Sequence, residues 1–120
     1  MPFNYLLTNL LVDVPFAVGA IFVDPEGEAV DWVTRHTDPF DLKVEGAYHS
    51  IFMRQLASLT ANTDVGKISS YILEGSRLTT LTHALPDGYY VVLVVDRNGS
   101  RGQALHRLRH TAEVIAQEIV

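Results

Sequence analysis

The chain has 120 residues, of which 48% are hydrophobic and 19% charged, which fits one compact domain over residues 1–120 with a single core. It contains no cysteine, so disulfides and thiolate zinc sites are excluded. The formal net charge is −5, and the arginines near the C-terminus make no concentrated basic face, so we expect no nucleic-acid partner.

The first predicted elements are a helix and a β-hairpin. Apolar residues over 3–14 recur at helical spacing and Pro15 follows them, which predicts a helix over about 3–13. Residues 16–23 are apolar on both faces of a strand, as in a central strand that is covered on each side. The stretch Asp-Pro-Glu-Gly at 24–27 has the residue types of a tight turn and leads into a second strand over 28–34.

A long helix follows the hairpin. Asp38 can cap it and Pro39 can occupy its first turn, and the amphipathic run continues to about residue 62. Met53 lies to one side of the apolar stripe, on the polar flank. The stripe that we expect to face the core consists of Val44, Ala47, Tyr48, Ile51, Phe52, Leu56 and Leu59.

Three strands and a last helix complete the chain. The β-rich runs at 67–75, 77–85 and 89–96 are separated by short turns and form a meander, and a final helix opens at Gly102. The order αββαβββα predicts an α+β sandwich, in which a five-stranded antiparallel sheet carries helices on both faces. The strands at 16–23 and 89–96 are the most apolar, so they should be neighbours at the centre.

The acidic stretch around the first turn resembles a metal site at first sight, because Asp24, Glu26 and Glu28 lie close together. A calcium loop needs oxygen ligands at its first, third and fifth positions and a glycine at the sixth, whereas Gly27 comes three residues after Asp24. We therefore predict that Asp24 hydrogen-bonds the backbone of its own turn and that no metal binds there.

The remaining chemical groups predict no enzyme site, cofactor or metal. His106 and His110 share a helical face, but the neighbouring arginines repel cations and no third ligand is evident. The glycines before the last helix lack the Lys-Ser/Thr of a phosphate-binding loop. His49 and Ser50 point about 100° apart on a helix and cannot act as base and nucleophile. We expect no catalytic residues.

The order of elements resembles that of the roadblock-type dynein light chain family, which includes MglB-like small GTPase regulators. The segments "VGAIFVDPEGEAV" and "LPDGYYVVLVV" and the final helix at Gly102 carry the resemblance, which covers nearly the whole chain. The matching positions are scaffold residues of turns and core: Gly19, Asp24, Gly27, Gly88 and Tyr89.

The resemblance implies a dimer, formed by two copies or with a paralogue, that binds a small Ras-like GTPase and changes its nucleotide cycle. Third strands would pair across the two-fold axis beside paired second helices, and the exposed edge of strand 67–74 favours such pairing. For the dimer interface this nominates Tyr48, Phe52, Ile68, Ser70 and Ile72. For contacts with the GTPase we expect residues on the outer flank of the long helix, which are His49, Met53, Arg54 and Ser58.

Two alternatives remain open at the level of sequence. One is a small sensory or ligand-binding α/β module with an internal pocket, and the other is an adaptor that binds a motor subunit like a dynein light chain. The N-terminus has no basic leader and no apolar run is long enough to span a membrane, so we expect a cytoplasmic protein without a membrane partner.

Overall fold

The computed structural model describes residues 3–35, 40–61 and 63–119. Along the chain its helices and strands follow the predicted order. They are α1 (Asn4–Asp13), β1 (Ala17–Val23), β2 (Ala29–Thr34), α2 (Phe40–Thr60), β3 (Ser70–Glu74), β4 (Leu78–Ala84), β5 (Tyr90–Asp96) and α3 (Arg101–Ile119). A short 3-10 turn, Pro86–Gly88, joins β4 to β5. The predicted helix start at Asp38 and Pro39 lies outside the described residues.

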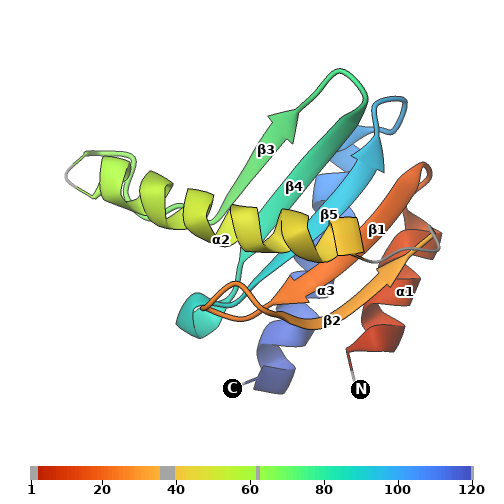
Figure 1. The fold of residues 1–120 in the computed structure, drawn as a ribbon, viewed down its shortest axis with the longest axis horizontal. Coiled ribbons are helices and arrows are strands. Elements are labelled where there is room, and N and C mark those ends of the chain that lie inside the picture. Colours follow the sequence, from red (N-terminus) through yellow and green to blue (C-terminus); the bar gives the residue numbers. More distant parts are fainter. Residues whose placement is uncertain (1–2, 36–39, 62, 120) are drawn as a thin grey trace.

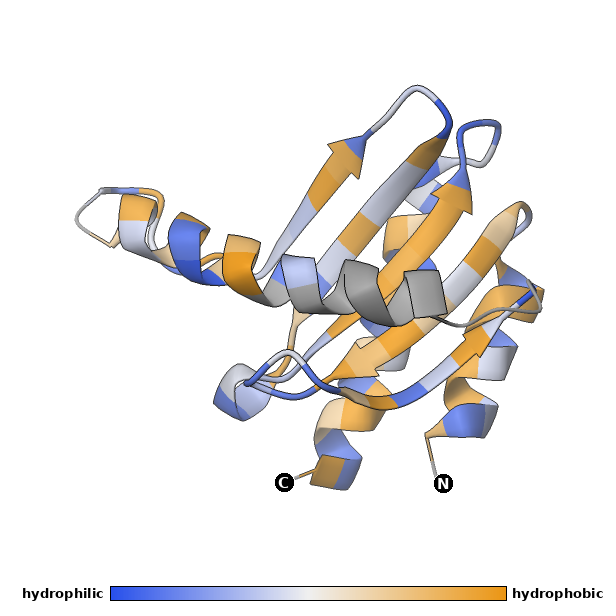
Figure 2. Cartoon of the chain, in the orientation of Figure 1, coloured by the Kyte–Doolittle hydropathy of each residue, from blue (hydrophilic) through white to orange (hydrophobic). Residues whose placement is uncertain are grey.

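The five strands form one antiparallel sheet in the order β2-β1-β5-β4-β3. The prediction that the first and last strands are central neighbours is confirmed, and β3 occupies an edge as expected. Burial explains the central position, because every residue of β1 except Val18 and every residue of β5 except Asp96 is buried. Figure 2 shows the same property as a nearly continuous hydrophobic β5.

Helices cover both faces of the sheet, which confirms the predicted sandwich (Figure 1). Helices α1 and α3 lie on one face and enclose the larger core, which includes Leu10, Phe22 and Leu108. Helix α2 crosses the other face over a smaller core. That smaller core is built on β1 and β5 from Ile21, Val23, Tyr90, Val92 and Val94.

The orientation of α2 differs from the prediction. Three members of its expected core stripe face solvent, since Tyr48, Ile51 and Leu59 are 66%, 49% and 74% exposed. Figure 1 gives the reason for Leu59, because the C-terminal end of α2 extends past β3 and beyond the edge of the sheet. Tyr48 and Ile51 lie nearer the middle of the helix and are exposed, because their neighbours His49 and Phe52 occupy the side that packs against β3.

Candidate functional site

An apolar surface joins the outward side of α2 to the edge strand β3. Exposed apolar side chains lie on both elements, and Leu73 of β3 lines a shallow hollow of about 320 Å³ together with α2 residues. We call this region the α2–β3 surface, and it consists of Tyr48, Ile51, Phe52, Gln55, Leu59 and Leu73. Contiguous exposed apolar surface of this kind marks an interaction site more often than isolated apolar residues do.

The edge of β3 adds backbone groups to this surface. In the described part of the chain β3 pairs only with β4, so one of its sides faces no other strand. An open strand edge presents N–H and C=O groups to which another strand can bind. The apolar side chains and the open edge together make a surface suited to pairing with a second chain.

His49 does not lie on the outer flank of α2, and that expectation is wrong. Its side chain is only 3% exposed, and Nδ1 forms hydrogen bonds with the hydroxyl of Tyr71 and, at 3.2 Å, with the hydroxyl of Thr82. The His49 and Tyr71 rings also stack, with centroids 5.6 Å apart. His49 therefore fixes α2 to strands β3 and β4 instead of being available to a partner.

The predicted dimer-interface residues are divided between both faces of the sheet. Tyr48 is exposed on α2, while Phe52 is half-buried and packs edge-on against Tyr71 with a centroid distance of 5.1 Å. Ile72 is exposed, but its cross-strand partner Leu81 belongs to the core under α1 and α3, so Ile72 lies on the face opposite α2. Ser70 and Ile68 are half-buried at the beginning of β3 and in the segment before it.

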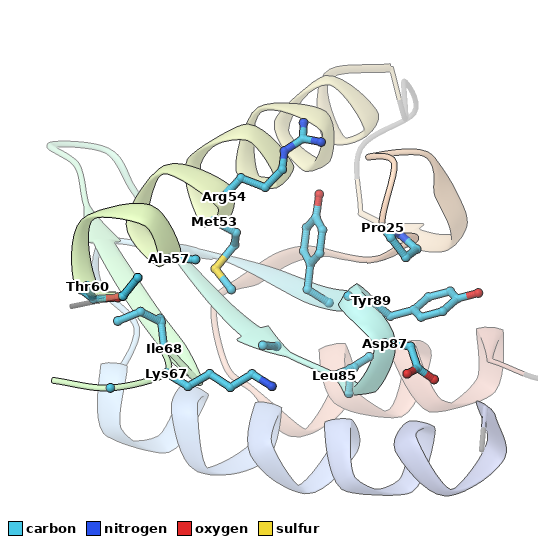
Figure 3. A pocket seen from close by; sticks show the side chains of 15 residues that line it. Pro25, Met53, Arg54, Ala57, Thr60, Lys67, Ile68, Leu85, Asp87 and Tyr89 are labelled. Carbon is cyan, nitrogen blue, oxygen red and sulfur yellow. The ribbon is translucent and has the colours of Figure 1, made fainter. Parts of the chain in front are cut away.

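Of the predicted partner contacts, Arg54 and Ser58 are exposed on α2 and Met53 is half-buried. Met53 and Arg54 line a pocket of about 730 Å³ that opens between α2, the segment before β3 and the turn before β5 (Figure 3). Its other lining residues are Pro25, Ala57, Thr60, Ala61, Gly66, Lys67, Ile68, Ala84, Leu85, Asp87, Gly88, Tyr89 and Tyr90.

The acidic stretch after β1 is a turn, as predicted. Asp24 Oδ1 accepts hydrogen bonds from the backbone N–H groups of Glu26 and Glu28, both at 2.9 Å. Gly27 has a φ of 90°, a conformation that glycine adopts without strain. Within the described residues, no three His, Asp or Glu side chains gather where they could hold a metal ion.

The histidines of β4 and α3 differ in their surroundings. His106 and His110 are exposed on α3, whereas His83 points from β4 toward that helix with a buried Nδ1 that has no hydrogen-bond partner in the described structure. Burial lowers the pKa of His83 below its ordinary value of 6.5, the Arg109 guanidinium lowers it further, and Glu113 opposes both effects. His83 is therefore neutral in the folded chain near neutral pH.

Solved structures that superpose on this chain identify its fold. A Roadblock/LC7 domain from Streptomyces avermitilis superposes with a TM-score of 0.87 at 14% identity, covering 97% of this chain and 96% of that domain. The chain has a roadblock-type fold. The gliding protein MglB of Thermus thermophilus matches with a TM-score of 0.84 at 16% identity, over 94% of this chain and 84% of MglB. MglC of Myxococcus xanthus matches with a TM-score of 0.72 at 23% identity, over 98% and 99% of the two chains.

Sequence comparisons add no further assignment to this roadblock-type chain, because no family model and no curated protein sequence matches it. Among the described helices, none combines the length and the apolar character needed to cross a membrane.

Two features of this chain are not evident from its sequence. Ile51 and Leu73 belong to the α2–β3 surface, although helical spacing places Ile51 in the expected core stripe and nothing in the sequence singles out Leu73. The pocket at Met53 was also missed, since its walls come from three separate parts of the sequence.

Proposed function

We propose that the chain is a single roadblock-type domain that dimerises and, as a dimer, binds a small Ras-like GTPase and modulates its nucleotide cycle. It acts on its partner without catalytic residues of its own. The observation that carries this proposal is the α2–β3 surface, which combines exposed apolar side chains with an open strand edge.

Dimerisation follows most directly from that surface. Pairing of two β3 edges around a two-fold axis satisfies the same backbone groups on both copies, as an isologous interface requires. The same axis brings the outward apolar side chains of two α2 helices close together, which removes the exposed area of Tyr48, Ile51 and Leu73 from water. A paralogue with an equivalent edge could take the place of the second copy.

The GTPase part of the proposal rests on the resemblance to the roadblock-type family and on the likeness to MglB in fold. Its expected docking residues are Met53, Arg54 and Ser58, which share α2 with the apolar surface. Arg54 is exposed and has no ion-pair partner among the described residues, so its charge is available to a partner. We assign Arg54 a binding role and no catalytic one.

A binding titration with small Ras-like GTPases tests this proposal. Arg54→Glu and Met53→Asp should each weaken binding by about tenfold or more, because each alters a contact expected near the middle of the docking face. His106→Glu on α3 provides the control, since α3 lies on the opposite face of the sheet and the variant should bind like the parent.

Sedimentation of the same variants separates binding from assembly, because neither substitution changes the β3 edge. Equal binding by the two α2 variants and the parent would show that the docking face is misassigned. Absence of binding to any such GTPase would contradict the proposed function itself.

A further inference from the structure

The pocket beside α2 has the size and composition of a small-molecule site. Its volume of about 730 Å³ falls within the range of about 300–1,000 Å³ that is typical of ligand pockets. One wall is α2, a second is the segment before β3, and the third is the turn before β5 (Figure 3). The hollow between these three walls is open to a ligand in the structure as it stands.

The interior of this pocket is mostly apolar. Met53 points from α2 into the hollow, and Ile68 and Leu85 face it from the other walls (Figure 3). Leu85 and Tyr90 are nearly fully buried, which gives the inner part of the pocket a fixed shape. Methionine adapts to irregular apolar partners and makes favourable contacts with aromatic rings. The interior therefore suits an aromatic or branched apolar body.

Two cationic side chains stand at the margins of the same pocket. Arg54 comes from α2 and Lys67 from the segment before β3, on opposite sides of the opening (Figure 3). Both are exposed, and neither has an ion-pair partner among the described residues. In a chain with a formal net charge of −5, a pair of cations beside an apolar hollow is a locally positive environment.

Asp87 fixes the direction in which a ligand would lie. It sits at the end of the pocket formed by the turn before β5, beyond Leu85 when seen from Lys67 (Figure 3). A carboxylate at that end repels an acidic group and tolerates an uncharged one. The acidic group of a ligand is therefore favoured away from this turn, in the opening between Arg54 and Lys67.

We propose that this pocket binds a small amphipathic anion, whose apolar body packs against Met53, Ile68 and Leu85 and whose acidic group lies in the opening, where Arg54 and Lys67 attract it from opposite sides. The proposal goes beyond the proposed function and does not depend on dimerisation or on a GTPase. A partner side chain that entered the pocket would be a different occupant, and the experiment below tests the isolated chain without any partner.

The probe is anilinonaphthalene sulfonate, an aromatic anion whose fluorescence rises in apolar surroundings. Its neutral counterpart is phenylnaphthylamine, which keeps the aromatic body and lacks the sulfonate. We expect the anion to bind with one saturable site per chain, more tightly than the neutral compound. Arg54→Gln and Lys67→Gln should each weaken anion binding by about fivefold to tenfold, because each removes one of the two positive charges that flank the acidic group. Both variants should bind the neutral compound like the parent.

Three further variants locate the site. Ala57→Phe places a ring at an exposed helix position that lines the pocket. It should weaken the binding of both probes without unfolding the chain. Arg107→Gln removes an exposed arginine from α3 on the other face of the sheet and should change the binding of neither probe. Leu59→Lys alters the α2–β3 surface, so its effect shows whether either probe binds there.

Several outcomes would overturn the assignment. If Leu59→Lys abolishes anion binding while Ala57→Phe leaves it intact, the probe binds the exposed α2–β3 surface and the pocket is not its site. If Arg54→Gln and Lys67→Gln weaken the binding of the anion and of the neutral compound equally, the two side chains shape the pocket and do not recognise the acidic group. Absence of saturable binding in the parent would refute the site altogether.

Discussion

Tyr71→Phe tests whether the buried His49 holds α2 on the sheet. The substitution removes only the hydroxyl that is hydrogen-bonded to His49 Nδ1. The Tyr71 ring contacts with His49 and Phe52 are retained, because phenylalanine has the same ring. The change in stability therefore reports the hydrogen bond and not the packing.

The expected cost follows from the burial of His49. With 3% exposure, its ring cannot replace the lost partner with water, although the Thr82 hydroxyl remains 3.2 Å from Nδ1. Losing one hydrogen bond at a buried polar group lowers the free energy of unfolding by about 1–2 kcal/mol. For a chain of 120 residues with an unfolding entropy of about 2.1 cal/mol/K per residue, the melting temperature should fall by about 4–8 °C.

Thermal unfolding followed by circular dichroism measures this difference, with all variants at one protein concentration because dimerisation would raise the melting temperature. Tyr5→Phe is the matched control, since Tyr5 is 55% exposed on α1 and its variant should melt like the parent. The double variant with His49→Leu should show a coupling of about 1 kcal/mol. If Tyr71→Phe melts no lower than Tyr5→Phe, or if the double variant is additive, His49 does not anchor the helix through Tyr71.

Three further predictions concern other parts of the fold. Asp24→Ala should lower the free energy of unfolding by about 1 kcal/mol, because two backbone N–H groups lose their acceptor. Asp24→Asn keeps an oxygen acceptor and should unfold like the parent, and added calcium should leave the melting temperatures of both variants unchanged. Gly88→Ala should lower the free energy of unfolding in urea by about 1 kcal/mol or more, since φ is 86° and the new Cβ would lie 3.2 Å from the Pro25 Cβ. A urea unfolding curve identical to that of the parent would contradict this. The pKa of His83 is lower in the folded than in the unfolded chain. The neutral His83 therefore makes its full contribution to the free energy of unfolding above about pH 6.5, and this free energy declines below that pH as the unfolded chain takes up the proton. His83→Gln should reduce that decline between about pH 7.5 and about pH 5.5, while the exposed His106→Gln should keep the slope of the parent.

The sheet and its layers were predictable because the apolar pattern of each strand indicates how deeply that strand is buried. Residues 16–23 are apolar on both faces and lie at the centre, and the edge position of β3 matches its more polar and exposed sequence. The turn at Asp24 was predictable for a similar reason, since its chemistry is local to a few residues.

The side of α2 that packs against the sheet could not be predicted from the apolar stripe of the helix. Apolar residues at helical spacing look the same whether they face a core or an interface, so Tyr48 and Leu59 were assigned to the interior. The correct anchor is His49, whose partners Tyr71 and Thr82 are 22 and 33 residues away in the sequence. The pocket has the same property, because Met53, Lys67 and Leu85 meet only after folding.

Sedimentation equilibrium at micromolar concentration tests the central claim, which is that the α2–β3 surface joins two chains. The parent should sediment as a dimer with twice the chain mass of 13.3 kDa. Leu73→Lys places a charge on that surface and should shift the equilibrium to the monomer, whereas Tyr5→Lys adds the same charge to an exposed position on α1 and should remain dimeric. A parent that sediments as a monomer at high concentration, or a Leu73→Lys variant as dimeric as the parent, would contradict the account.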